Sequence, residues 1–169
     1  MFSAKDIILV QASFARVVPM QDTATNDFYD RLFAIAPSLR ELFPSDLRDQ
    51  KRKLMQMIAT AVGGLNSLDK IIPAVKALGA RHSGYGVTGA HYAMVGEALL
   101  WTLERGLGQG FTPEMRSAWA KVYGVLAATM QAGATEVAEL RAAECAGEYL
   151  QGPAAELAPT RLVNSDPSS

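Results

Sequence analysis

Hydrophobic residues recur at steps of three and four along nearly the whole chain, the spacing of helices that each bury one face. No stretch alternates apolar and polar positions with the β-branched enrichment that is typical of strands. The pattern therefore predicts an all-α protein. We expect helices over approximately residues 3–18, 23–36, 37–43, 45–65, 68–82, 89–105 and 113–136, with the last one long.

Polar residues and prolines mark where several of these helices begin. Ser3 followed by Asp6 has the spacing of a capping box, and Thr88 stands where it can cap the helix that follows a glycine-containing turn. Pro113 lies at the first position of the final helix, where its missing N–H costs nothing. Glycines at 106, 108 and 110 predict a loop before that helix.

Composition and charge exclude several classes of function. The 169 residues suffice for one domain with a hydrophobic core but leave no room for a second large catalytic module. With 16 Lys and Arg against 17 Asp and Glu, the net charge of -1 gives no general attraction to nucleic acid. Cys145 is the single cysteine, which excludes an intramolecular disulfide and a cysteine-based zinc site.

Two segments near the ends bear on location and domain organisation. The apolar run from Ile7 to Val10 is too short for a signal peptide or a membrane span, so we expect a cytoplasmic protein with no membrane partner. From Gly152 the sequence is rich in Pro, Ala and Ser. We expect a folded domain over residues 1–142 and a C-terminal extension over residues 143–169 that is largely flexible or disordered.

Polar residues interrupt the apolar faces at Gln50, His82, Tyr92 and Glu136. A buried polar group without a hydrogen bond costs about 1–3 kcal/mol, so such residues need partners. If Glu136 accepts from the Tyr92 phenol and either contacts a ring nitrogen of His82, the imidazole tautomer is fixed. The other ring nitrogen is then free to bind a metal ion.

A structural interpretation of the same residues stays open. His82 can be a core histidine with satisfied hydrogen bonds, and Tyr92 a core aromatic whose hydroxyl reaches the surface. Glu136 can be a solvated carboxylate on the final helix.

Six segments along the chain, taken together, resemble one protein family. They are FYDRLF, PSLRELF, QKRKL, LGARHSGYGV, HYAMVGEALL and AWAKVYGVLA, and they run in one register over roughly residues 3–140. This order resembles the globin domain of bacterial flavohaemoglobins and of their single-domain relatives. The resemblance implies a globin fold, with helices packed around a haem pocket.

The resemblance also implies roles for particular residues. His82 corresponds to the proximal ligand of the iron in haem b, which is iron protoporphyrin IX. Tyr29 and Gln50 correspond to the distal tyrosine and glutamine that face the bound gas. Phe43 corresponds to the phenylalanine that wedges against the porphyrin, and Leu54 to the apolar residue one turn beyond the glutamine.

On the proximal side, the resemblance assigns two further residues. Tyr92 and Glu136 correspond to the pair that hydrogen-bonds to the proximal histidine. Arg81 stands beside that histidine and can pair with a haem propionate, with a solvated arginine at a helix end as the alternative.

The implied function is binding of O2, CO and NO at a five-coordinate iron, with oxidation of NO to nitrate. Flavohaemoglobins continue into a reductase, so we expect this chain to depend on an external reductase or electron donor. Two alternatives stay open: a non-catalytic globin for O2 storage, delivery or gas sensing, and a haem-free helical regulatory domain. The oligomeric state is left open.

Overall fold

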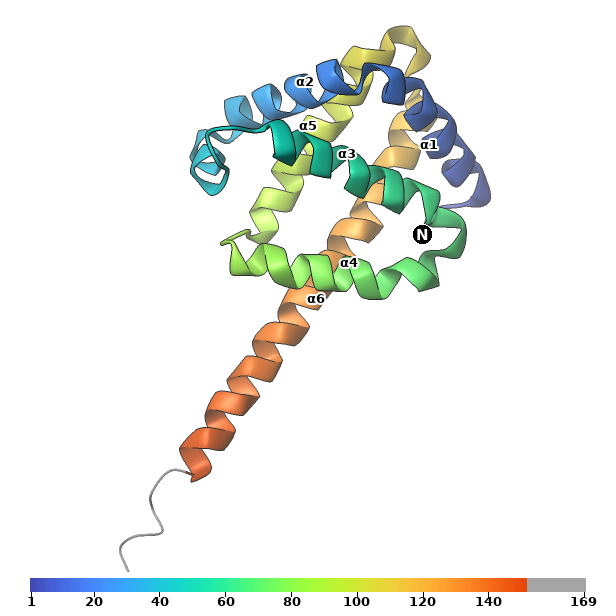
Figure 1. Ribbon diagram of the computed structural model, residues 1–169. Helices are drawn as coiled ribbons and strands as arrows, with labels where there is room; N and C mark the ends of the chain where they lie inside the picture. Colours follow the sequence, from blue (N-terminus) through green and yellow to red (C-terminus); the bar gives the residue numbers. More distant parts are fainter. Residues whose placement is uncertain (152–169) are drawn as a thin grey trace, which may run out of the picture. The chain divides into compact units, whose positions relative to one another are not determined.

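A computed structural model describes the backbone of residues 1–151 and the side chains of residues 1–147. Within residues 1–151 the chain forms helices and no strand, which confirms the all-α prediction. The α-helices are α1 (Ala4–Val17), α2 (Gln21–Ile35), α3 (Arg48–Gly63), α4 (Leu68–Gly84), α5 (Gly89–Leu107) and α6 (Pro113–Gln151) (Figure 1). Short 3-10 turns join them at η1 (Val18–Met20), η2 (Pro37–Leu42), η3 (Leu65–Ser67) and η4 (Gly108–Gly110).

The predicted capping residues begin their helices as expected. The Ser3 hydroxyl accepts from the backbone N–H of Asp6 at 3.2 Å, and the Asp6 carboxylate accepts from the N–H of Ser3 at 2.7 Å. Thr88 caps α5, and the partner in its capping box is a histidine: Nδ1 of His91 accepts from the N–H of Thr88 at 3.0 Å. Both helix starts are therefore fixed by local hydrogen bonds.

Some helix ends differ from the expected ones. Gly106, which we expected in a loop, lies inside α5, which ends at Leu107. A glycine costs a helix about 1 kcal/mol relative to alanine, and the burial of Leu103 and Leu107 on the same helix offsets this cost. α6 continues to Gln151, beyond the domain boundary expected at residue 142, which stays a prediction. The segment from Gly152, where we expected disorder, lies outside the described residues.

Residues Met1–Thr135 form one compact unit, and a second unit begins at Glu136 within α6. The first unit contains two hydrophobic clusters. One joins α1, α5 and the first part of α6, and in it the Trp119 indole donates to the Ser13 hydroxyl at 2.9 Å. The other joins α2 and η2 to α5 around Phe28, Tyr29 and Leu32. α3 and α4 both cross the face of this unit that is turned to the viewer in Figure 1.

Candidate functional site

Aromatic side chains from α2 and the corner after η2 pack edge to face in the second cluster. The Tyr29 side chain is only 3% exposed, and its ring centroid lies 5.1 Å from that of Phe28 and 5.6 Å from that of Phe43. Phe33 closes the group, 5.5 Å from Phe43. These tilted contacts fix each ring against its neighbours, so Tyr29 and Phe43 form a rigid wall.

The corner that carries Phe43 is held by Arg40. The Arg40 guanidinium donates to the carbonyl oxygens of Phe43 at 3.2 Å, Pro44 at 2.8 Å and Ser45 at 3.1 Å. The same group lies over the Phe33 ring, 5.2 Å from its centroid. Patterns of residue types do not reveal the role of Arg40, because its partners are backbone carbonyls.

Gln50 brings a second polar group to the aromatic wall. It lies in the first turn of α3, half-buried, and one turn later Leu54 packs against the same cluster. Burial raises the pKa of the Tyr29 phenol to about 12, and a hydrogen bond with the Gln50 side chain lowers it in part. The phenol therefore stays neutral at physiological pH and keeps its proton available for donation.

His82 lies in the last turn of α4, half-buried, and its tautomer is set by its own helix. Nδ1 of His82 lies 2.8 Å from the carbonyl oxygen of Leu78. Because a carbonyl only accepts hydrogen bonds, Nδ1 carries the proton and Nε2 of the neutral ring keeps a free lone pair. From the sequence we expect Tyr92 or Glu136 as partners of this ring. The Leu78 carbonyl, one turn earlier on the same helix, is a partner that residue types do not reveal.

Three predicted site residues remain: Tyr92, Arg81 and Glu136. Tyr92 is half-buried on α5, burial raises the pKa of its phenol, and its backbone carbonyl accepts from the Tyr123 hydroxyl. Arg81 is exposed, and its pairing with a propionate stays a prediction. Glu136 opens the second unit, so its link to His82 and Tyr92 also stays a prediction.

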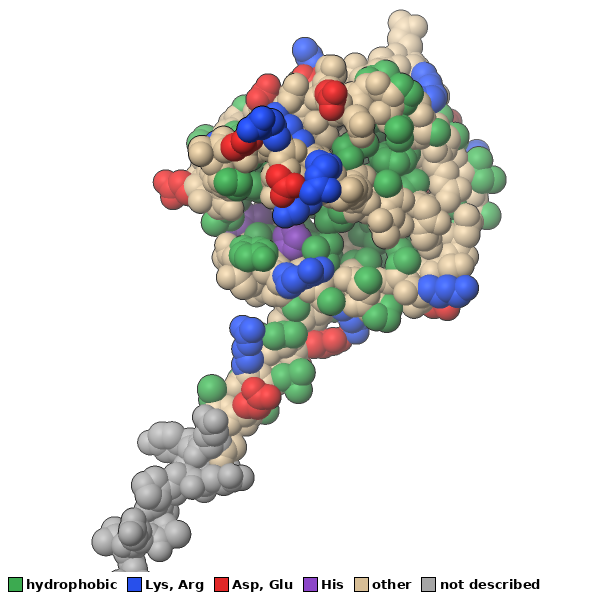
Figure 2. All heavy atoms as spheres, viewed as in Figure 1, with side chains coloured by type: hydrophobic (Ala, Val, Ile, Leu, Met, Phe, Trp, Pro, Cys, Tyr) green, Lys and Arg blue, Asp and Glu red, His purple; other side chains and the backbone are tan. Residues whose placement is uncertain are grey.

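The apolar face of α4 is only partly covered by protein. Gly79 is the one buried residue of this helix. Its large apolar side chains are all half-exposed: Leu68, Ile71, Ile72, Val75 and Leu78. Figure 2 shows hydrophobic side chains gathered in a recess between α3 and α4, with histidine at its edge. An amphipathic helix normally buries such a face, so this one fits a further apolar group.

The donor set and the recess together fit a haem. The free lone pair on Nε2 of His82 is what iron needs from an imidazole, and the half-exposed side chains of α4 are what the porphyrin needs from its surroundings. The residues present therefore agree with the group that the resemblance implies.

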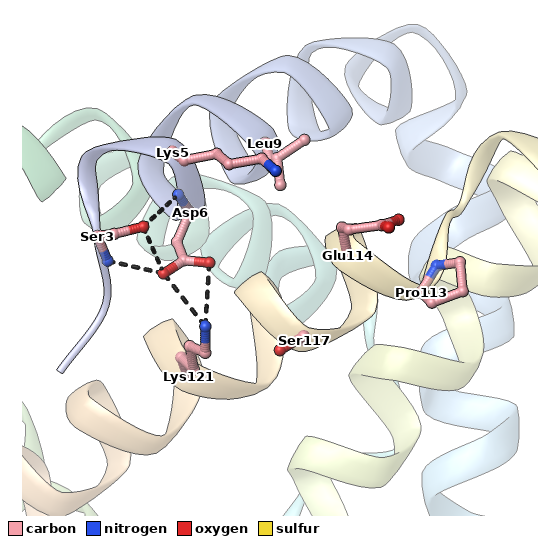
Figure 3. Close-up of a pocket in the computed structure, with 8 residues that line it drawn as sticks. All are labelled: Ser3, Lys5, Asp6, Leu9, Pro113, Glu114, Ser117 and Lys121. Atoms are coloured by element: carbon pink, nitrogen blue, oxygen red, sulfur yellow. Dashed lines mark hydrogen bonds and ion pairs between the residues drawn. The ribbon is translucent and has the colours of Figure 1, made fainter.

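A separate hollow of about 410 Å³ lies where α1 and α6 begin (Figure 3). Its lining consists of Ser3, Lys5, Asp6, Leu9, Pro113, Glu114, Ser117 and Lys121. The Asp6 carboxylate accepts from both the hydroxyl and the N–H of Ser3, and Lys121 approaches it at 3.4 Å. These side chains bind one another, and we assign the hollow to the capping of the two helices rather than to a ligand.

None of the helices within residues 1–151 combines the length and the apolar character needed to cross a membrane.

Comparison with known proteins gives consistent results. Residues 26–130 match the family described as Globin, and this range includes the aromatic wall and His82. A flavohemoprotein of Bacillus subtilis is 33% identical over 132 residues, which cover 75% of this chain and 33% of the relative. The chain thus spans about a third of the length of that curated relative.

A solved structure shares the arrangement of helices. It is an engineered carbene transferase from Rhodothermus marinus, also described as a candidate nitric oxide dioxygenase. It matches with a TM-score of 0.75 at 23% sequence identity and covers 84% of this chain and 99% of that chain. At this identity the likeness shows the fold alone.

Proposed function

This chain belongs to the globin family, and on that premise we propose that it is a haem b globin that binds O2, CO and NO and oxidises NO to nitrate, with electrons from a separate reductase. The observation that carries the proposal is the hydrogen bond of His82. With Nδ1 bound to the Leu78 carbonyl at 2.8 Å, Nε2 is the ring nitrogen left for iron.

Four residues would hold the haem. His82 would ligate the iron through Nε2, while Phe43 and Leu54 would pack against the porphyrin. Arg81, exposed next to the ligand, would pair with a propionate. When bound, the haem would supply an iron that takes a diatomic gas and exchanges electrons with a donor.

Tyr29 and Gln50 would act on the bound gas. A neutral phenol and an amide both donate hydrogen bonds, and such bonds favour a diatomic ligand that carries partial negative charge. The raised pKa of Tyr29, about 12, keeps this donor protonated throughout the physiological range. The Tyr29 ring packs against Phe43, and Leu54 packs against the same apolar cluster, whose low polarity would strengthen the hydrogen bonds of the phenol.

At the imidazole itself, the Leu78 carbonyl would hold the Nδ1 proton. A hydrogen bond from Nδ1 makes Nε2 a stronger donor to iron and fixes the ring orientation. We propose Tyr92 as a positioning residue for this imidazole, and the same role for Glu136 stays a prediction from the resemblance. A hydrogen bond that makes the ligand more electron-rich would favour turnover over simple storage.

The test is NO consumption by the haem-loaded protein under air, followed with an NO electrode in the presence of a reductant and a generic flavin reductase. We expect many turnovers with nitrate as the product, and slower consumption by the Tyr29→Phe variant. A protein that binds gases reversibly but consumes only one equivalent of NO would instead be a storage, delivery or sensing globin. A protein that shows no Soret band after expression with ample haem would be a haem-free helical domain.

A further inference from the structure

α4 and α6 meet through their backbones at two points within the first unit. A methyl group placed on Gly79 would stand 1.9 Å from the carbonyl oxygen of Met130. One placed on Gly133 would stand 2.2 Å from the carbonyl oxygen of Lys76. Both separations are far shorter than any side chain allows, so only glycine fits at either position while the helices stay this close.

The two contacts are reciprocal. On α4, Gly79 contacts α6, and the carbonyl of Lys76, three residues earlier, receives the contact from α6. On α6, Gly133 and the carbonyl of Met130 have the same spacing and the same roles. This spacing places both features of a helix on one face, so the helices touch over a full turn. Both glycines are buried in the middle of their helices, where glycine is disfavoured relative to alanine. The close approach supplies the reason for their presence.

Gly79 stands next to Leu78 and three residues before His82. The Leu78 carbonyl holds Nδ1 of His82, so carbonyl and imidazole are carried by the same turn of α4. Any change in the distance between α4 and α6 at Gly79 would move both together. A contact between backbones also leaves no flexible side chain to absorb the change.

We propose that the crossing of Gly79 and Gly133 is a positioning device for the iron ligand. It sets the distance of α4 from α6 and the rotation of α4 about its own axis. These two together set the position of Nε2 of His82 in the recess. This inference rests on the proposed haem function. Gly79 and Gly133 are positioning residues here, because neither is argued to touch the haem or the gas.

The test compares Gly79→Ala with two matched controls. Gly84 on α4 and Gly124 on α6 have no atom within 4 Å of an added methyl group. We expect Gly79→Ala to lower the Tm by about 5 °C or more and to shift the iron–imidazole stretching frequency in resonance Raman spectra. Both controls should keep that frequency and keep or raise the Tm, because alanine favours the helix.

A second comparison separates positioning from general loosening. In a His82→Gly background with imidazole supplied in solution, the ligand is no longer attached to α4. Adding Gly79→Ala should then leave the frequency unchanged, although the Tm still falls. A shift that persists with free imidazole, or a haem-loaded Gly79→Ala protein with the parent frequency, would overturn the proposal.

Two measurements cover the case in which Gly79→Ala does not fold. Gly133→Ala places its methyl group against the Lys76 carbonyl, six residues before the ligand. We expect it to lower the Tm and to shift the iron–imidazole stretching frequency in the same way as Gly79→Ala, but by a smaller amount. Hydrogen exchange in the unmodified haem-loaded protein should show the amides of residues 77–80 as slow as those of residues 122–127. Fast local opening of α4 would contradict the crossing.

The failures of the two proposals are distinguishable. A protein that takes up no haem contradicts the proposed function, whereas a haem-loaded protein whose frequency ignores Gly79 contradicts only the positioning role.

Discussion

Arg40 and Phe43 bind each other in both directions across the corner after η2: the N–H of Phe43 donates to the Arg40 carbonyl, and the Arg40 guanidinium donates to the Phe43 carbonyl, each at 3.2 Å. The Arg40 guanidinium also donates to the carbonyl oxygens of Pro44 and Ser45, the next two residues along the chain. The position of the Phe43 ring against Tyr29 therefore depends on one partly buried arginine.

Replacing Arg40 with alanine should release the corner. We expect a loss of about 1–2 kcal/mol in the free energy of unfolding, because hydrogen bonds from a charged donor to backbone carbonyls are lost. Urea denaturation measures this loss. Arg52→Ala is the matched control, since Arg52 makes an exposed ion pair with Asp49, and water and salt screen such pairs so that they contribute little to stability. Equal losses in the two variants would mean that the corner does not depend on Arg40.

Replacing Tyr29 with phenylalanine should speed the dissociation of O2. Loss of one hydrogen bond worth about 1.4 kcal/mol corresponds to about a tenfold faster rate. Stopped-flow displacement of O2 by CO measures the rate. Tyr85→Phe is the control, since that side chain is 68% exposed. Unchanged dissociation in Tyr29→Phe would remove Tyr29 from the site.

The same tyrosine should make stability depend on alkaline pH. Burial raises the pKa of Tyr29 from 10 to about 12, so the folded protein holds this proton more tightly than the unfolded chain. The stabilisation is fully present below pH 10 and is lost as the pH rises through 12. We expect Tyr29→Phe to lose less stability than the parent between pH 9 and pH 11, measured by urea midpoints at each pH. Parallel losses would contradict the shift.

Asp6 should make stability depend on acidic pH in the opposite sense. Hydrogen bonds from the Ser3 backbone and hydroxyl hold the pKa of its carboxyl below the ordinary value of 3.8, with a smaller contribution from Lys121. The folded state therefore binds this proton less readily than the unfolded chain, and the stabilisation present above pH 4 fades as the pH falls. Asp6→Asn should cost less stability at pH 3 than at pH 7, as urea midpoints at the two pH values measure, and an equal cost at both would contradict the lowered pKa.

The fold follows from local patterns in the sequence to a large extent. Spacing of apolar residues places the helices, and Ser3 and Thr88 begin theirs because a cap needs only neighbours along the chain. Helix ends are harder to predict, as Gly106 shows: its cost to the helix is local, but the burial that offsets it comes from the tertiary structure.

The site could be predicted only in part. The residues that carry the family resemblance include Tyr29, Phe43 and Leu54, which the structure packs into one cluster, while their roles stay predictions. The groups that hold this cluster and the imidazole are backbone atoms: the carbonyls bound by Arg40, and that of Leu78. Every residue has a backbone carbonyl, so the residue types in the sequence do not show which carbonyls accept these hydrogen bonds. In the sequence Gly79 is only a weak helix former. The structure shows why a glycine is needed there, because the backbone of Met130 leaves no space for a side chain.

The central claim is that His82 holds haem iron, and the absorption spectrum of the reduced, CO-treated protein tests it most directly. We predict a haem-globin Soret band at one haem per chain in the parent and in His91→Ala, which changes the only other histidine. In His82→Ala that band should be lost or displaced, and in His82→Gly added imidazole should restore it. A His82→Ala protein with the colour, spectrum and CO binding of the parent would contradict the account.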